Sequence, residues 1–153
     1  MKKIDSFRGE YAFLSNMFQV VIEHDGITYP SSENLYQAFK TPERRERKLI
    51  AKLPPNQSKN YWKFNAIKTP NFHRDKLEYM EIALRAKFAD PHLAAALIMG
   101  TGDAELVEGN WWGDGFWGVS DKTGHGHNHL GKLLMKLREE IRASTEGKTT
   151  KKS

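Results

Sequence analysis

The change from strand to helix that decides the fold lies in residues 20–40, which read VVIEHDGITYPSSENLYQAFK. Asp25-Gly26 lies between β-forming residues, and this dipeptide is typical of the tight turn of a β-hairpin. Pro30 then ends the strand, and either of the two serines after it is a good N-cap for a helix that runs to about Lys40. An antiparallel hairpin followed directly by a helix is typical of an α+β fold.

The hydrophobic pattern of the remaining chain is mainly helical, because apolar residues recur at spacings of three and four. In order, we expect a basic helix that opens at Thr41-Pro42 and ends before Pro54-Pro55, helices over residues 73–88, 92–99 and 130–142, and short strands at 106–108 and 116–119. These elements predict one mainly helical α+β domain with a small antiparallel sheet over residues 1–142. Residues 143–153 are small, polar and non-periodic, and we expect them to form a disordered basic tail.

The composition excludes several classes of protein. The chain has 153 residues, of which 39% are hydrophobic, so it can build the core of one domain. It has no cysteine, which excludes disulfide scaffolds, thiolate zinc sites, iron–sulfur clusters and cysteine nucleophiles. No apolar run approaches the roughly 18 residues of a membrane span, and the first ten residues do not resemble a signal peptide. We therefore expect a soluble cytoplasmic protein.

The formal net charge of +5 is unevenly distributed along the chain. Residues 40–76 contain eleven Lys and Arg against three Asp and Glu, a local charge of +8, and the tail adds +2. The rest of the chain therefore carries −5. Such a basic block favours a phosphate-bearing partner, although Lys-rich helices are often only solvated faces.

Two segments in the first forty residues combine aromatic and polar side chains. Residues 7–18, FRGEYAFLSNMF, suit stacking on a planar base while Arg8 binds an anion, but a strand with its aromatics packed inward explains them better. In the helix that ends near Lys40, Glu33, Gln37 and Lys40 form a strip at helical spacing. The helix macrodipole favours a Glu in the first turn in any case, so this strip alone does not predict a site.

Two glycine-rich segments are harder to explain by packing. Residues 108–118, EGNWWGDGFWG, place Asp114 between glycines on a loop of the kind that carries binding and catalytic groups. Residues 124–131, GHGHNHLG, run into the last helix, where backbone N–H groups can hold a phosphate. Their three alternating His lack an acidic or Cys partner at a metal-motif spacing, so we expect adventitious metal binding and no resident metal.

Taken in order, these segments resemble the NADAR family, also called the YbiA-like proteins. The resemblance extends from residue 7 to about residue 142. It is carried by FLSNMF at 13–18, SSENLYQAFK at 31–40, MEIALRAKF at 80–88, LVEGN at 106–110, DGFWG at 114–118 and GHNHLGKLLMKLR at 126–138. One departure is Tyr61-Trp62-Lys63, where the family often has Gly-Arg.

The resemblance implies a YbiA-like fold and an N-glycosidase, an enzyme that hydrolyses the bond between a ribose anomeric carbon and a nitrogen. It puts Glu33, Asp114 and Trp117 on the expected catalytic positions. We expect the substrate to be bound by Arg8, Gly9, Tyr11, Ser15, Asn16, Lys40, Lys68, Trp112, Gly118, Asn128 and Gly131. Neither a cofactor nor a metal is implied.

The chemistry of such a reaction suggests a role for each group. Cleavage of a ribosyl C–N bond builds positive charge on the sugar, which a nearby carboxylate stabilises. By analogy with other glycosidases, we expect Glu33 to act as the general acid and base and Asp114 to act on the sugar side or to orient water. Trp117 and Tyr11 would stack on the sugar or base. The phosphates would be held by Arg8, Lys40 and Lys68.

The resemblance implies two kinds of substrate. Some relatives remove ADP-ribose from guanine in DNA, as antitoxins to an ADP-ribosylating toxin, and others cleave riboflavin-pathway ribosylamino-pyrimidines. The basic block favours ADP-ribosylated DNA, with an antitoxin or repair role and a partner from a toxin system. A phosphoribosyl small molecule, cleaved in a damage-control role, is the alternative. A non-catalytic module that binds ADP-ribose or nucleic acid is the second alternative, and no membrane partner is expected.

Overall fold

The computed structural model describes residues 2–152, with side chains described for residues 2–145. The chain forms two compact units, one made of residues 15–89 and the other of residues 1–14 together with 90–153. Both units combine helices with two-stranded sheets, so the predicted α+β class is confirmed. Within the described residues, we find no helix whose length and hydrophobicity would let it cross a membrane.

The predicted hairpin is present in the unit of residues 15–89. It consists of β2 (Ile22–His24) and β3 (Ile27–Tyr29), which pair antiparallel. Asp25 and Gly26 join the two strands, and both have left-handed backbone with φ of 52° and 74°. Two successive positive φ values are what a type I′ turn requires, so the Asp-Gly signal is confirmed.

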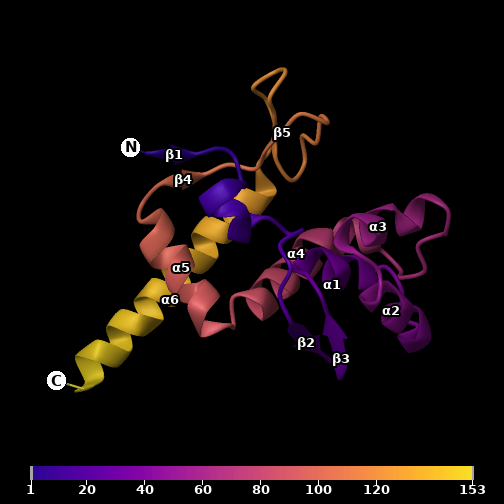
Figure 1. Ribbon diagram of the computed structural model, residues 1–153, viewed down its shortest axis with the longest axis horizontal. Helices are drawn as coiled ribbons and strands as arrows, with labels where there is room; N and C mark the ends of the chain where they lie inside the picture. Colours follow the sequence, from indigo (N-terminus) through magenta and orange to yellow (C-terminus); the bar gives the residue numbers. More distant parts are fainter. Residues whose placement is uncertain (1, 153) are drawn as a thin grey trace. The chain divides into compact units, whose positions relative to one another are not determined.

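Helix α1 (Ser32–Ala38) forms the centre of this unit, because all of its residues are buried. Ser31 caps the helix through its Oγ, which accepts a hydrogen bond from the Asn34 backbone N–H at 3.0 Å. Three further helices pack against α1: α2 (Arg44–Ala51), α3 (Pro55–Asn60) and α4 (Phe72–Lys87) (Figure 1).

Two parts of this unit differ from the prediction. Helix α2 begins at Arg44 and not at Thr41-Pro42, because the Thr41 Oγ1 accepts the backbone N–H of Glu43 and closes a turn there. The sequence also does not predict α3 and the following 3-10 helix η2 (Tyr61–Lys63). These short, polar elements lack the apolar spacing that marks a helix in a sequence.

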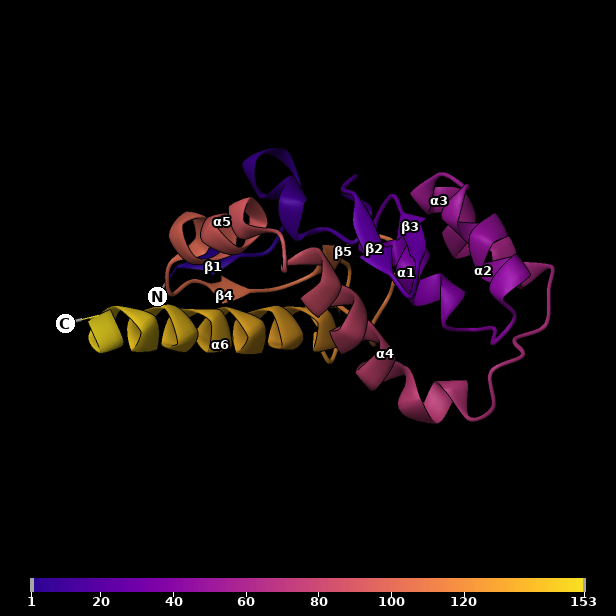
Figure 2. The same ribbon diagram turned by 90° about the horizontal axis from the view of Figure 1, so that it is seen from below.

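The strands of the other unit pair in parallel, in contrast to the antiparallel sheet that the sequence predicts. β1 (Lys3–Ile4) pairs with β4 (Glu105–Leu106), and β5 (Gly109–Asn110) pairs with β6 (Val119–Ser120). Parallel pairs join strands that are remote or connected by long loops, so local patterns do not reveal them. Figure 2 shows β1 and β4 between α5 (Pro91–Thr101) and α6 (His129–Lys152).

The N-terminal aromatic segment is a helix and not the predicted strand. η1 (Gly9–Leu14) is a 3-10 helix, and it begins at a glycine with φ of 59°. Leu14 is fully buried, whereas Tyr11 and Phe13 are half-buried. η1 packs against α5, where the ring of Phe13 lies close to Gly100.

Helix α6 extends past Arg142, where the sequence predicts its end. The Thr145 hydroxyl donates to the Ile141 carbonyl, so residues 143–145 continue the helix and do not begin a disordered tail. The backbone stays helical to Lys152, and the side chains from residue 146 onward lie outside the described residues.

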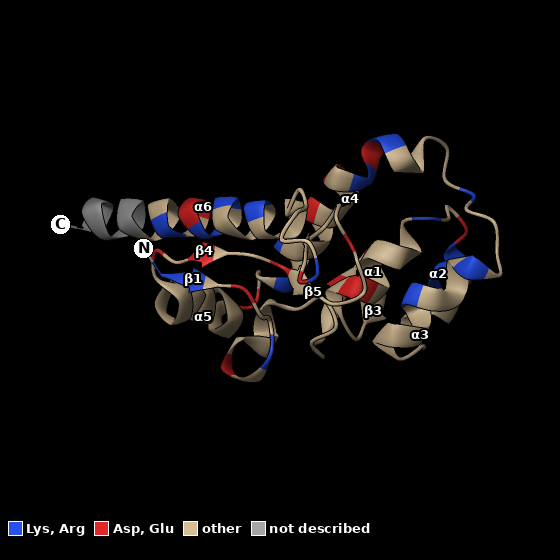
Figure 3. Ribbon diagram, turned by 90° about the horizontal axis from the view of Figure 1, so that it is seen from above, with Lys and Arg blue, Asp and Glu red and all other residues tan. Residues whose placement is uncertain are grey.

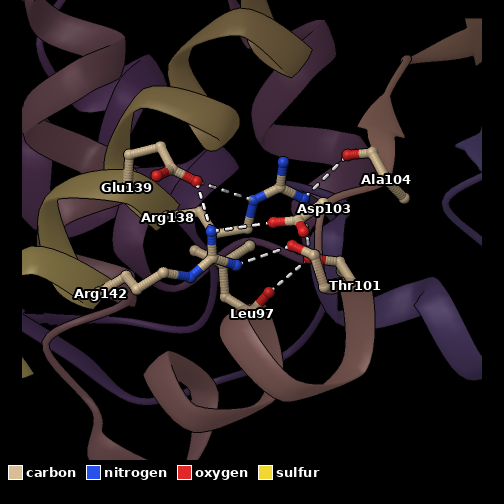
Figure 4. Close-up of polar contacts among 8 residues, drawn as sticks. Leu97, Thr101, Asp103, Ala104, Arg138, Glu139 and Arg142 are labelled. Carbon is tan, nitrogen blue, oxygen red and sulfur yellow. Dashed lines mark hydrogen bonds and ion pairs between the residues drawn. The ribbon is translucent and has the colours of Figure 1, made fainter. Parts of the chain in front are cut away.

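A buried arginine ties α6 to the turn after α5 (Figure 4). Arg138 is only 4% exposed, and its Nη1 donates to the Thr101 Oγ1 at 3.0 Å and to the Ala104 carbonyl at 2.9 Å. Burial, followed by repulsion from Arg142, lowers the pKa of Arg138. Arg142 itself donates to the Gly102 carbonyl at 2.8 Å. Together the two arginines bind carbonyl groups at the end of α5 and fix the start of β4.

Candidate active site

A hydrogen-bonded loop holds the first turn of α1, which carries the predicted catalytic carboxyl group. The Glu33 backbone N–H donates to the Asn16 carbonyl at 3.1 Å, and the Ser32 hydroxyl donates to the Asn16 Oδ1 at 2.9 Å. Asn16 Nδ2 contacts the sulfur of Met80 on α4 at 3.3 Å. Asn16 is 9% exposed, so it supports the backbone of Glu33 from within the core. Its predicted contact with substrate stays a prediction.

A buried lysine supports the same loop. Lys87 on α4 is 1% exposed, and its Nζ donates to the Ser15 carbonyl at 2.8 Å. The ammonium also lies over the rings of Phe18 and Phe88, 5.8 and 5.1 Å from their centroids. The sequence pattern does not single out Lys87, although it lies within the MEIALRAKF segment that carries the family resemblance.

The Glu33 side chain is 7% exposed and accepts a hydrogen bond from Gln37 Nε2 at 2.8 Å. Gln37 lies one turn further along α1, and its backbone carbonyl accepts the indole N–H of Trp62 at 3.0 Å. Lys40 follows the helix, with its Nζ over the rings of Tyr36 and Phe72. Burial lowers the pKa of Lys40, and the negative charge of Glu33 opposes that shift. The predicted strip of Glu33, Gln37 and Lys40 is therefore a partly buried polar cluster.

A backbone hydrogen bond joins Lys68 to Lys40, but the charge of the Lys68 side chain is already paired with carboxylates. Its N–H donates to the Lys40 carbonyl at 2.9 Å, and its Nζ lies 3.0 Å from Glu43 and 3.1 Å from Glu46. The hydrogen bonds to these carboxylates raise the pKa of Lys68. A phosphate would have to compete with both of them, and the predicted phosphate contact stays a prediction.

In the other unit, Asp114 organises the loop that carries Trp117. Its Oδ1 accepts the backbone N–H groups of Phe116 and Trp117, each at 3.0 Å. Asn110, which is 1% exposed, holds the loop from below: its Nδ2 donates to the Asp114 carbonyl at 2.8 Å, and its Oδ1 accepts the Asp114 N–H at 2.7 Å. The indole of Trp117 meets the ring of Phe116 edge-on at 4.8 Å.

The predicted substrate loop lies against the same strand region. Asn128 has a left-handed φ of 53°, its Oδ1 accepts the Glu108 N–H at 3.0 Å, and its Nδ2 donates to the Leu106 carbonyl at 2.9 Å. Gly118 and Gly131 allow close approach of the backbone. A Cβ at Gly118 would lie 2.1 Å from the Glu108 oxygen, and one at Gly131 would lie 2.1 Å from the Leu106 oxygen. Asp114, Trp117, Gly118, Asn128 and Gly131 are thus parts of one tightly packed arrangement.

The three alternating histidines do not converge. The rings of His127 and His129 stack at 5.5 Å, and His129 also contacts Phe116 at 4.6 Å. His125 is exposed. Across the part of the chain that the structure describes, no three His, Asp or Glu side chains gather in a way that could hold a metal ion.

The other predicted substrate residues are dispersed. Arg8 is exposed just before η1, Gly9 begins η1, and the Tyr11 hydroxyl accepts a hydrogen bond from Lys2 Nζ at 3.0 Å. Trp112 is 47% exposed and meets the ring of Trp111 edge-on at 5.8 Å. Ser15, Asn16, Glu33, Lys40 and Lys68 belong to the unit of residues 15–89, and the remaining predicted residues belong to the other unit.

Comparison with known proteins identifies relatives that match most of this chain. A family model described as the NADAR domain matches residues 5–142. The chain is 35% identical over 145 residues to the N-glycosidase YbiA of Escherichia coli (strain K12), in an alignment that covers 86% of this chain and 82% of that protein. It is 33% identical over 133 residues to the riboflavin biosynthesis protein VVA0006 of Vibrio vulnificus (strain YJ016). That alignment covers 86% of this chain but only 36% of the Vibrio protein.

The fold also has a solved counterpart. The structure superimposes on the NMR structure of E. coli YbiA with a TM-score of 0.79 and 32% sequence identity. The match covers 95% of this chain and 89% of that one, so the similarity extends over both compact units.

Proposed function

The chain belongs to the NADAR family and is an N-glycosidase, and from this premise we propose that it hydrolyses the ribosyl C–N bond joining ADP-ribose to guanine in DNA. The observation that carries the proposed chemistry is the placement of Glu33. The residue is 7% exposed, it lies in the first turn of a capped helix, and its backbone N–H donates to the Asn16 carbonyl. A general acid or base needs such a fixed position, because proton transfer depends on hydrogen-bond geometry.

In this mechanism Glu33 donates a proton to the leaving nitrogen or takes one from the attacking water. Its Oε1 accepts the hydrogen bond from Gln37 Nε2, and the charge of Lys40 interacts with its own. General acid–base catalysis of this kind contributes roughly 10²–10⁴-fold to a rate.

The loop of Asp114 supplies the second part of the proposed machinery. Asp114 carries the negative charge that would stabilise the oxocarbenium-like sugar or orient water. Because its Oδ1 also accepts the backbone N–H of Trp117, the carboxylate fixes the backbone from which the indole projects. Trp117 would then offer a flat apolar face to the sugar or base.

Exposed basic residues favour DNA as the polymer that carries the modified base. Figure 3 shows Lys and Arg along α2 and the chain that follows it. Arg45, Lys48, Lys52 and Lys63 are exposed there. A row of exposed cations attracts a phosphate backbone without reading its sequence. With DNA as the substrate, the proposed biological role is that of an antitoxin or repair enzyme that reverses the action of an ADP-ribosylating toxin.

A second candidate is a riboflavin-pathway ribosylamino-pyrimidine phosphate. The observation that favours it is the name of the Vibrio vulnificus relative, a riboflavin biosynthesis protein. The ribosyl C–N chemistry would be the same, and only a few basic residues would be needed to hold a single phosphate.

The two substrates can be separated by direct assay. The purified protein is incubated with an ADP-ribosylated guanine oligonucleotide and, separately, with a ribosylamino-pyrimidine phosphate, and the released sugar is measured. Release of ADP-ribose supports the first proposal, and release of ribose phosphate alone replaces it with the second. Tight binding without release from either would instead support a non-catalytic binding module.

The role of Glu33 is tested with Glu33→Gln. We expect kcat to fall by roughly 10²–10⁴-fold with the fold intact, because the amide cannot exchange a proton. Glu23→Gln is the matched control, since Glu23 is an exposed carboxylate on β2 of the same unit. A Glu33→Gln protein that is folded and turns over like Glu23→Gln would contradict the assignment.

A further inference from the structure

In the buried side-chain amide of Gln37, the nitrogen makes a hydrogen bond and the oxygen does not. Its Nε2 donates to Glu33 Oε1 at 2.8 Å, whereas its Oε1 is buried and has no hydrogen-bond donor among the described residues. Gln37 as a whole is 3% exposed. A buried carbonyl oxygen without a partner is unfavourable, so such an atom in a native protein requires an explanation.

The neighbouring carboxylate determines which way the amide faces. An ionised Glu33 only accepts hydrogen bonds, so the amide nitrogen must point toward it and the amide oxygen must point away. The backbone is held as well, because the Gln37 carbonyl accepts the Trp62 indole N–H. Gln37 Oε1 is therefore an oriented acceptor that no donor among the described residues satisfies.

The position of that acceptor indicates which donor would reach it. Glu33, as the proposed acid and base, must lie within hydrogen-bond distance of the leaving nitrogen. Gln37 lies one helical turn away on the same face of α1 and touches the same carboxylate. An N–H group on the leaving base would thus be placed beside the Oε1 atom. A guanine and an aminopyrimidine share this chemistry, because each carries an amino group on an aromatic ring.

We propose that Gln37 is a specificity-determining residue that holds Glu33 through its Nε2 and accepts an amino N–H of the leaving base through its Oε1. This inference rests on the proposed function for the identity of the base. It also predicts that a base without the amino group leaves the Gln37 oxygen unsatisfied and is bound less well.

Binding of matched ligands tests the inference without turnover. Guanosine and inosine monophosphates differ only in the exocyclic amino group, and an aminopyrimidine with its deamino counterpart forms a second pair. Calorimetry on the wild-type protein should show roughly three- to tenfold tighter binding of the amino member, as expected for one hydrogen bond. The pair with the larger ratio indicates the class of base that the site accepts.

Three variants separate the two halves of the amide. Gln37→Met keeps the length of the side chain but removes both polar atoms, and it should abolish the preference for the amino ligand. Gln37→Glu, when it is protonated, keeps both a donor to Glu33 and a carbonyl acceptor, so it should retain that preference at acidic pH. Gln57→Met is the control, because Gln57 is exposed on α3 and lies outside the site, and it should bind like the wild type.

The hydrogen bond from Gln37 Nε2 to Glu33 is tested separately, by the pH dependence of the reaction. Loss of the Nε2 donor makes Glu33 easier to protonate, so the acidic limb of the kcat/KM profile should move to higher pH in Gln37→Met. Lys40, whose charge interacts with that of Glu33, and Lys76 on α4, which acts on Lys40, are both unchanged in the variant.

The outcomes distinguish this inference from the proposed function. A wild-type protein with no preference for amino ligands, or a Gln37→Met protein that keeps it, overturns the role of Gln37. A wild-type protein that keeps the preference but releases sugar from neither substrate leaves the acceptor in place and removes the proposed function.

Discussion

The substitution Gly118→Ala should destabilise the loop that carries Asp114 and Trp117. The added Cβ would lie 2.1 Å from the Glu108 carbonyl oxygen and 2.7 Å from Asn110 Nδ2. Ordinary contact begins at 3.4 Å, so the Glu108 carbonyl must move by roughly 1.3 Å. That movement breaks the 2.8 Å hydrogen bond from the Val119 N–H to the same oxygen.

The magnitude follows from these two effects. Overpacking costs about 1–3 kcal/mol, and the lost backbone hydrogen bond costs about 0.5–1.5 kcal/mol. We expect the free energy of unfolding to fall by roughly 2–4 kcal/mol, which for a chain of this length lowers Tm by roughly 5–15 °C. Calorimetry and urea unfolding measure this change, and glycosidase activity should fall with it because Trp117 is displaced.

Gly115→Ala is the matched control in the same loop. The closest atom to a Cβ at Gly115 is 4.0 Å away, and its φ is not in the left-handed region. This variant should therefore keep a stability close to that of the wild type. If Gly118→Ala and Gly115→Ala unfold at the same denaturant concentration, the close approach of Gly118 to the Glu108 carbonyl is wrong.

Three further predictions concern other positions. Asn128→Ala should lower the free energy of unfolding by roughly 2–4 kcal/mol, because it removes two hydrogen bonds and places Ala at a positive φ. Asn128→Gly loses the same hydrogen bonds but tolerates that φ, so it should cost about 1 kcal/mol less. Equal losses in the two variants would refute the backbone contribution. Arg138→Leu should cost about 1–3 kcal/mol in urea unfolding because two acceptors lose their donor, and a change as small as that of the half-exposed Arg142→Leu would contradict this. Burial lowers the pKa of Lys40 below 10.5, so the unfolded chain binds that proton more tightly. Wild-type stability should rise relative to Lys40→Met as pH approaches 10.5, and a difference that is constant between pH 8 and 10.5 would refute the shift.

The sequence predicted those parts of the fold that depend on neighbouring residues. The Asp25-Gly26 turn, the Ser31 cap and helix α4 are each determined within a few residues, by φ preferences, a side-chain oxygen or apolar spacing. The order of motifs along the chain also sufficed to indicate the family, and the capping pattern placed Glu33 in the first turn of a helix.

The supports of the site could not be predicted in this way. In the sequence, Lys87 resembles any lysine near the end of a helix. Its role depends on the Ser15 carbonyl, which is distant in sequence and accepts a hydrogen bond from it only in the folded protein. The basic block predicts free cations, yet Lys68 is paired with two carboxylates. Likewise, nothing local indicates that Asn128 bridges Leu106 and Glu108.

The sequence by itself thus determined the hairpin turn, the main helices and the family, and it supplied the carboxyl groups that we propose for catalysis, because each depends on residue type and short-range spacing. Only the tertiary structure decided which polar atoms are buried, which charges are neutralised and which strands pair in parallel. The physical reason is that hydrogen bonds, burial and close backbone approach join residues far apart in the chain. The side-chain amide of Gln37 shows this most clearly. Only folding buries its oxygen away from water without a hydrogen-bond donor, while its nitrogen bonds Glu33.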